Sequence, residues 1–407
     1  MSFLQSQQLK LTAFNETVTG SRSSVINIKP TWGVSVIRDD TSGTTGAGAG
    51  VDELNGEIRL QTGTSANNIA NIRTLQRGQY RAGMTGEVGI GVRIPTAPTG
   101  TQNAQWGYFD SLNGLGFGCD STGVYTFYKT GGSTTTYYQS TWNVDTMDGS
   151  ANANNPSGLT FSLSQGNIFQ IEFVWYGYGT IRFYISMIQN NIRTRLEVHR
   201  INVLNSISVV DPNQPITVQS SNGASSTSNF TVYLAGRQFS LFGGDVVTQT
   251  RAVSDFISNF TITAAQNTWQ PLIAIRMKAT FGPSNRTNSV RAIWTGYQML
   301  CNNPCEFMVT TGALTSGTPS TWAAPTDWTS SESAIEVKIQ TGSLTASGTN
   351  YTVGRSILGS SGTKSSTLLT AQSSIPMGAI GEFILWVRRT TTTATVVSAV
   401  MEWEEQW

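Results

Sequence analysis

The sequence predicts an all-β protein with two antiparallel β-sandwich or jelly-roll-like domains, long loops and little helix. Charged residues make up only 12% of its 407 residues, about half the roughly 25% of an average soluble domain. The 41 glycines can supply the positive φ angles that tight turns need. Above all, apolar and polar residues alternate with a period of two in several segments, which indicates half-buried strands.

This alternation recurs along the chain. It occurs in 88–94, 273–281, 335–339 and 383–387. Residues 168–185 contain two alternating arms around the sequence WYGYG, so we predict a hairpin there. Trp175 is expected to anchor that hairpin in the core, with Tyr176 and Tyr178 at its tip. Helical periodicity is scarce, and only 252–260 fits one or two helical turns.

Polar stretches set the expected domain boundaries. We predict an N-terminal arm over 1–20, a first sandwich over 21–245, a connector over 246–265 and a second sandwich over 266–407. The LKLTAF segment of the arm alternates like a strand. We therefore expect residues 1–14 to anchor the chain on a neighbouring subunit.

The charge balance and the rare residues exclude several function classes. The 25 basic and 24 acidic residues leave no surplus to neutralise a phosphate backbone, so no nucleic acid is expected as a partner. No apolar run has the length of a membrane helix, and the start does not resemble a secretory signal, so we expect no membrane insertion and synthesis in a host cytoplasm. The chain has one histidine and three cysteines. Cys119, Cys301 and Cys305 are too few for a disulfide framework, and the close pair Cys301 and Cys305 is expected to be reduced. We predict no metal site and no cofactor.

Only one histidine in the sequence could act as the general base of a nucleophilic catalytic site. His199 alternates on one strand face with Glu197 and Ile201, which is typical of a structural strand histidine. The Asp145 and Asp148 side chains lie before a glycine, where hydrogen bonds to loop amides explain them and no calcium-loop spacing occurs.

A β-sandwich glycosidase would need two carboxylates on adjacent strands. Glu172 in the hairpin is one candidate, and we expect no second acidic residue on its strand face. A further acidic group is formed by Glu402, Glu404 and Glu405. We therefore predict no catalytic residues.

Two blocks, TWNVDTMDG (141–149) and NPSGLTFSLSQGNIFQIEFVWYGYGTIRFYI (155–185), form a specific pattern. This pattern resembles structural proteins of tailed bacteriophages and large DNA viruses, and weaker likeness extends to 272–277, 333–337 and 402–404. An insertion at 151–154 and Ser164-Gln165 depart from it within a loop. The matching residues are Trp142, Asn143, Asp145, Asp148, Gly149, Pro156, Ser157, Gly158, Ile168, Phe169, Ile171, Phe173, Trp175, Gly177, Gly179 and Arg182. The resemblance implies a virion component and brings no catalytic residues.

These observations lead to three hypotheses. The first is a non-enzymatic virion structural protein, a capsid-associated spike, fibre or decoration subunit, located in the virion and assembled with other virion proteins as a homo-oligomer, with a trimer as our expectation. The alternative is a carbohydrate- or receptor-binding adhesin of the particle that binds a host-surface glycan. The third is a β-sandwich glycoside hydrolase that depends on Glu172. The candidate glycan or partner contacts are Tyr176, Tyr178, Tyr137, Tyr138, Trp106 and Tyr108.

Overall fold

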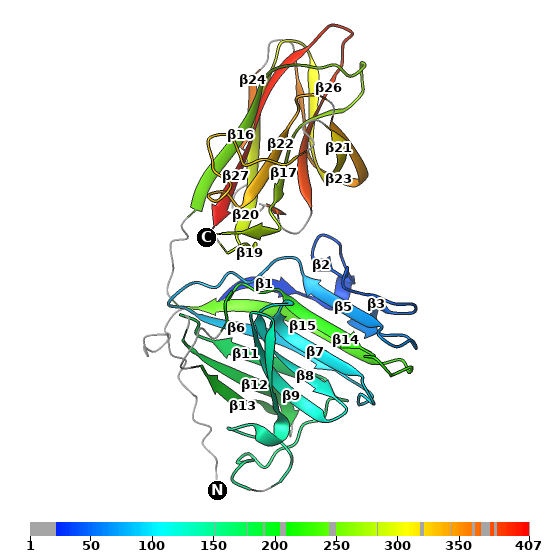
Figure 1. Ribbon diagram of the computed structural model, residues 1–407, viewed down its shortest axis with the longest axis vertical. Helices are drawn as coiled ribbons and strands as arrows, with labels where there is room; N and C mark the ends of the chain where they lie inside the picture. The colour runs from blue at the N-terminus through cyan, green and yellow to red at the C-terminus, as the bar shows by residue number, and fades with distance from the viewer. Residues whose placement is uncertain are drawn as a thin grey trace. The chain divides into compact units, whose positions relative to one another are not determined.

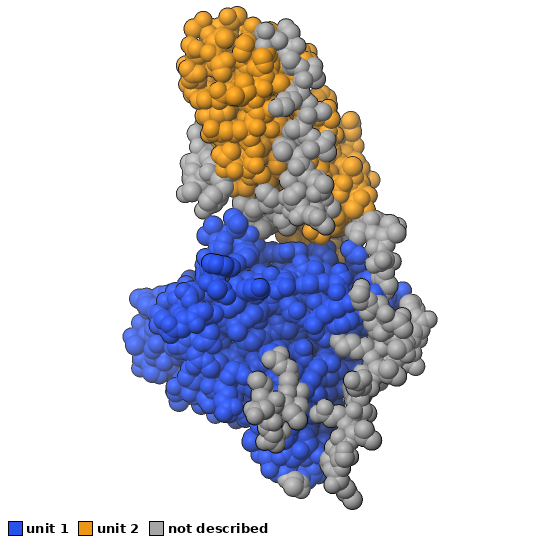
Figure 2. Space-filling model, turned by 180° about the vertical axis from the view of Figure 1, so that it is seen from behind, with its two compact units in different colours: residues 1–246 blue, residues 247–407 orange. Residues whose placement is uncertain are grey.

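The computed structural model describes residues 22–150, 152–176, 178–189, 192–203, 209–243, 250–282, 284–317, 321–342, 344–359, 363–367, 375–377 and 381–406. The chain divides into two compact units, residues 1–246 and 247–407 (Figure 2). Over the described ranges the regular elements are strands and short 3-10 turns such as η1 (Pro30–Trp32) and η2 (Gln139–Thr141). The all-β prediction is therefore confirmed. No helix in these ranges is long and apolar enough to cross a membrane.

The first unit contains two antiparallel sheets (Figure 1). The eight-stranded sheet has the order β13 (Ile192–Asn202), β12 (Thr180–Gln189), β11 (Asn167–Phe173), β6 (Thr85–Arg93), β15 (Thr231–Phe242), β4 (Glu57–Gln61) and β3 (Gly50–Leu54), and β1 (Arg22–Ile28) pairs with β15. The seven-stranded sheet has the order β10 (Ser133–Tyr138), β9 (Gly123–Thr130), β8 (Gly114–Asp120), β7 (Asn103–Phe109), β14 (Ile216–Ser221), β5 (Ile69–Thr74) and β2 (Asp39–Asp40).

Aromatic side chains from both sheets meet between them. The ring of Trp106 on β7 lies 4.9 Å from that of Phe169 on β11, and the ring of Phe117 on β8 lies 5.3 Å from that of Phe183 on β12. All four side chains are buried. The two sheets therefore form a sandwich whose core is filled by the apolar residues of each alternating strand.

The second unit is also built from two antiparallel sheets. One has the order β16 (Thr250–Thr261), β27 (Val396–Gln406), β20 (Arg291–Cys301) and β24 (Thr363–Thr367), with β25 (Ile375–Pro376) paired to β20. The other has the order β22 (Ile335–Ile339), β17 (Gln270–Met277), β26 (Glu382–Arg389), β21 (Cys305–Gly317) and β23 (Leu344–Leu358). A short hairpin joins β18 (Thr280–Phe281) to β19 (Arg286–Thr287). The core between the sheets contains the buried Trp294, Trp403, Phe307 and Phe383.

The structure corrects part of the predicted chain organisation. Residues 250–261 form strand β16 of the second unit, so the predicted helical turns at 252–260 and most of the predicted connector are wrong. The N-terminal arm, including LKLTAF, lies outside the described residues. Cys119, Cys301 and Cys305 are free and buried.

The predicted hairpin is present, but Trp175 does not lie in the core between the sheets as predicted. Strands β11 and β12 pair directly, with Phe169 opposite Ile185. Trp175 follows the end of β11 and is only half-buried. Its indole Nε1 donates a hydrogen bond to the Val209 carbonyl oxygen at 2.7 Å, and its ring meets the edge of Tyr80. Trp175 therefore packs at the end of the sandwich and not between the sheets.

The loop that carries the first sequence block is held by its own acidic side chains, as the sequence predicts. The Asp145 carboxylate accepts the backbone N–H groups of Met147 at 2.9 Å and Ser157 at 3.1 Å. Asp148 accepts the N–H of Ser150 at 2.8 Å. These carboxylates therefore stabilise the loop.

A β-bulge separates His199 from Glu197. The pairing of β12 with β13 shifts between Phe183 and Tyr184, so His199 faces the core while Glu197 faces outward. The prediction that both residues share one face is therefore wrong. The His199 Nδ1 atom accepts the N–H of Asn143 at 3.3 Å, and the imidazole packs near the rings of Tyr137 and Phe183.

Burial of His199 gives a pH-dependent stability. It lowers the pKa of the imidazole to about 4, whereas an unfolded histidine titrates near 6.5. Between pH 6.5 and pH 4 the imidazole is therefore protonated in the unfolded chain but neutral in the folded one. The free energy of unfolding is thus highest above pH 6.5 and falls as the pH drops below that value. We expect the free energy of unfolding to fall by about 2 kcal/mol from pH 7.5 to pH 5. Urea unfolding at both pH values measures this, and an identical fall in His199→Gln would contradict it.

Candidate functional site

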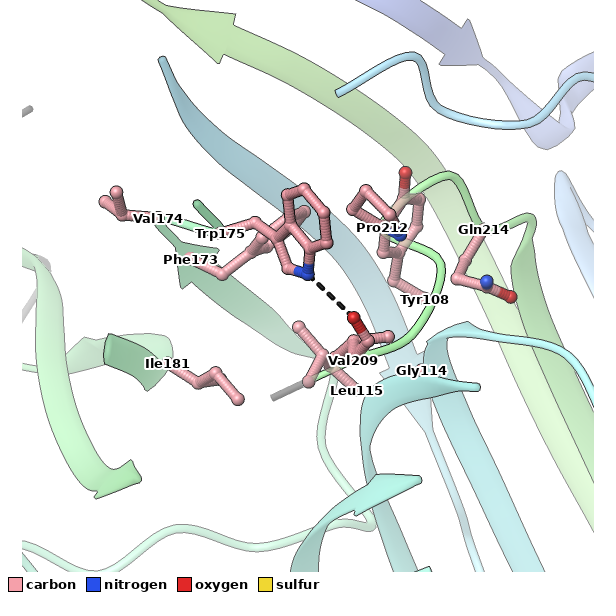
Figure 3. Close-up of a pocket in the computed structure, with 10 residues that line it drawn as sticks. All are labelled: Tyr108, Gly114, Leu115, Phe173, Val174, Trp175, Ile181, Val209, Pro212 and Gln214. Atoms are coloured by element: carbon pink, nitrogen blue, oxygen red, sulfur yellow. Dashed lines mark hydrogen bonds between the residues drawn. The ribbon is translucent and has the colours of Figure 1, made fainter. Parts of the chain in front are cut away.

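A small apolar pocket lies beside the hairpin, at one end of the first sandwich. Trp175, Phe173, Val209 and Pro212 line it together with Tyr108 (Figure 3). Its cavity volume is about 10 Å³, on the order of a single water molecule. The indole N–H already donates to Val209. The pocket is therefore a packing gap that cannot hold a sugar ring.

Two buried carboxylates lie side by side on the outer face of the eight-stranded sheet. Glu172 on β11 is directly opposite Glu87 on β6, and both side chains are almost fully buried. The prediction that Glu172 has no acidic neighbour on its face is therefore wrong. The sequence could not reveal this neighbour, because the two residues are 85 positions apart and only the strand pairing joins them.

An arginine lies between these two carboxylates. The Arg195 Nη2 atom is 3.2 Å from Glu172 Oε2 and 3.6 Å from Glu87 Oε2, while Arg22 pairs with Glu87. The guanidinium of Arg195 also lies 3.6 Å over the Tyr184 ring. A glycosidase needs water or a sugar oxygen between its two acids. Here a cation already occupies that place, so the geometry is that of a structural ion-pair network.

Two of the remaining acidic candidates, Glu402 and Glu405, also have structural contacts. Glu402 accepts a hydrogen bond from Gln298 at 2.6 Å, and Glu405 is buried within the second unit. Among the residues that the structure describes, no three histidine, cysteine or acidic side chains are grouped so as to hold a metal ion.

The outer face of the seven-stranded sheet carries a continuous line of polar and aromatic residues. Strand pairing places one residue from each of six consecutive strands directly beside the next. Because the residues adjacent to them in the sequence, such as Trp106, face the core, these residues face outward. We call this line the amide row. Its members, from β10 to β5, are Tyr138, Tyr125, Gly118, Gln105, Gln219 and Asn71.

Hydrogen bonds hold the side chains of the amide row in place. The Tyr138 hydroxyl donates to Asp120 Oδ2 at 2.7 Å, and Gln105 Nε2 donates to the Tyr125 hydroxyl at 3.3 Å. Asn71 Nδ2 donates to Gln219 Oε1 at 3.3 Å. The hydrogen bond to Asp120 also raises the pKa of Tyr138. The row is therefore ordered before any ligand binds.

Gly118 lets an aromatic ring lie against the sheet. A Cβ atom at this position would be 2.4 Å from Cζ of Tyr125, closer than two carbon atoms can approach. The Tyr125 ring therefore covers β8, and the Tyr138 ring meets its edge, with the two centroids 5.6 Å apart. The β10 end of the row is thus aromatic, whereas the β5 end consists of amides.

The amide row has the chemistry that hydroxylated ligands require. Each amide offers two donors and one acceptor group, and the bonds above use only part of this capacity. A tyrosine ring adds an apolar face beside a polar hydroxyl. Tyr138, Gln105 and Gln219 are all half-buried, so their exposed atoms can contact a ligand while their positions stay fixed. Tyr125 and Asn71 are buried and support these three side chains from below.

The structure separates the six aromatic candidates. Trp106 and Tyr108 are 0% and 1% exposed, so the prediction that they contact a partner is wrong. Tyr138 belongs to the amide row, whereas Tyr137 points inward and packs against the core. Tyr176 and Tyr178 are 50% and 67% exposed at the hairpin tip.

Sequence reasoning missed most of the row. Gln105 and Gln219 occupy outward positions of the alternating segments NAQWGYF and ITVQSS, and this alternation was the available signal. Tyr125 and Asn71 were also missed. These residues align only because of the register between neighbouring strands, and the sequence of one strand does not specify that register.

Comparison with known proteins identifies no family. No family model matches the chain, and no curated protein matches it. Among solved structures, the CBM2 module of an evolved Dit protein from Lactobacillus casei BL23 phage J-1 is similar at 11% identity, covering 56% of this chain and 100% of that one, with a TM-score of 0.36. A legume lectin-like domain from Entamoeba histolytica is 10% identical, covering 53% and 96%, with a TM-score of 0.32.

A Bacillus licheniformis β-glucanase is similar at 12% identity, covering 55% of this chain and 99% of that one, with a TM-score of 0.33. These proteins thus include binding domains and an enzyme.

Proposed function

We propose that the first unit binds carbohydrate through the amide row. The observation that carries this proposal is the alignment of two tyrosines and three amides across six consecutive strands of one sheet face. Sugar hydroxyls hydrogen-bond to amides, and the C–H face of a sugar ring packs on a tyrosine ring. The protein would act by binding and not by catalysis, since Arg195 lies between Glu172 and Glu87.

We further propose that this binding serves a virus particle. The pattern over 141–185 supports this, because it resembles virion structural proteins. The protein would then be a homo-oligomeric adhesin, a trimer in our proposal, that attaches the particle to a host-surface glycan. Immunogold labelling of purified particles tests the location, and its absence from them would contradict this part of the proposal.

Glycan binding is tested with the full chain on a glycan array, followed by calorimetry on the glycans that bind. We expect Tyr138→Ala to weaken binding about tenfold, or about 1.4 kcal/mol, because it removes the accessible part of a ring at the β10 end. Tyr138→Phe keeps the ring and loses only the bond to Asp120, so its loss should be smaller.

Tyr233→Ala is the matched control. Tyr233 is a half-buried tyrosine on β15 of the other sheet, where its ring lies 4.1 Å from Arg93. Equal losses in Tyr138→Ala and Tyr233→Ala, or an array without any bound glycan, would refute the proposal. Polysaccharide cleavage that disappears in Glu172→Gln would support the hydrolase in its place.

A further inference from the structure

We infer that the ligand of the amide row is a neutral, linear glycan several sugar rings long, lying across the strands from β10 to β5. This inference rests on the proposed function and specifies its ligand class. It follows from three features of the row, namely its length, its two ends and its charge.

The length of the row exceeds that of a single sugar. Neighbouring strands are about 4.8 Å apart, so the four steps from Tyr138 to Gln219, the outermost accessible members, span about 19 Å. One sugar ring can contact only neighbouring members of the row. A ligand that contacts both Tyr138 and Gln219 must therefore be an extended chain.

The two ends of the row differ. β10 is the outermost strand of its sheet, so the row continues to the sheet edge at Tyr138. At the other end the loop formed by residues 41–47 approaches Asn71. Thr44 Oγ1 donates to the Asn71 carbonyl oxygen at 3.1 Å, and a Cβ atom at Gly43 would be 3.0 Å from Asn71 Oδ1. A chain would therefore extend past Tyr138 and end beside this loop.

The charges near the row favour a neutral ligand. The six residues of the row are uncharged. On the same face, Arg73 is paired with Asp40 at 2.6 Å, and Lys129 lies over the Phe109 ring. Asp120, bonded to Tyr138, adds a negative charge at the aromatic end. An acidic sugar at this end of the row would be repelled by this carboxylate.

The inference is tested by calorimetry on two series of two to six units. The neutral series are linear β-1,4-linked oligomers of glucose, mannose and N-acetylglucosamine, and the acidic series are oligouronates of the same lengths. We expect affinity for a neutral series to rise at least tenfold from two to six units, and oligouronates to bind more weakly.

A variant at the amide end locates the effect. Gln219→Ala should remove most of the rise in affinity between two and six units, because the longer ligands lose their contact at the amide end. Gln238→Ala is the matched control, since Gln238 is a half-buried amide on β15, opposite Gly89 in the other sheet. Unfolding midpoints of both variants establish that they are folded.

The outcomes separate this inference from the proposed function. Equal affinity at two and six units, or binding restricted to acidic or branched glycans on the array, overturns the inference and leaves glycan binding in place. A rise with length that persists in Gln219→Ala overturns the placement across the strands. An array without any bound glycan overturns both.

Discussion

Replacing Glu405 by alanine is expected to destabilise the second unit by about 3–5 kcal/mol. The Glu405 side chain is 0% exposed. Its carboxylate accepts hydrogen bonds from Ser333 Oγ at 2.6 Å and from the Ala334 N–H at 3.2 Å, which hold the segment before β22 against β27. It also lies 2.9 Å from Arg251 Nη2. Alanine removes all of these contacts and leaves buried donors without an acceptor.

The neighbouring Glu404 provides the control. It lies on the opposite face of β27 and is half-buried, so Glu404→Ala should change the free energy of unfolding by less than about 0.5 kcal/mol. Urea unfolding of the full chain, followed by tryptophan fluorescence, measures both variants. Similar midpoints for Glu405→Ala and the wild type would show that the buried carboxylate does not stabilise this unit.

Replacing Asp39 by alanine is expected to destabilise the first unit by a similar amount, about 3–5 kcal/mol. Asp39 on β2 and Arg237 on β15 form an ion pair of 2.6 Å that joins the two sheets, and their side chains are 0% and 2% exposed. In the described part of the chain, Arg237 Nε and Nη1 have no hydrogen-bond partner. Loss of Asp39 therefore leaves a buried cation without its anion.

A double replacement distinguishes the ion pair from simple packing. Asp39→Leu combined with Arg237→Met removes both charges and keeps most of the volume, so it should recover most of the stability lost in either single variant. The same unfolding measurement gives the coupling energy. Losses that simply add in the double variant would contradict a direct electrostatic link between the two residues.

Strand β16 illustrates why the second sandwich begins before the predicted residue 266. Its inward positions are Val253, Asp255 and Ile257, and all three are buried. An acidic residue in the middle of this series interrupts the alternation of apolar and polar residues. The sequence pattern therefore does not predict a strand in this segment. Asp255 is tolerated there because the distant Thr326 donates to it through its N–H at 3.0 Å and its hydroxyl at 2.8 Å.

The aromatic residues of the candidate site illustrate a second limit. Trp106 and Tyr138 are both aromatic residues of short alternating segments, yet one is buried between the sheets and the other lies on the outer face. Which face becomes the core depends on the sheet against which a strand packs. The alternation gives two faces and does not say which of them is buried when both contain aromatic residues.

Local patterns in the sequence are enough to predict the strands, the hairpin at 168–185, and the loop that Asp145 and Asp148 hold. These features depend on residues close together in the chain, whose side-chain period and backbone hydrogen bonds are local. The amide row, the Glu172–Glu87 pair and the Asp39–Arg237 ion pair form only in the folded chain. Each of these joins residues from distant segments, and strand register and sheet packing, which are properties of the whole fold, bring them together.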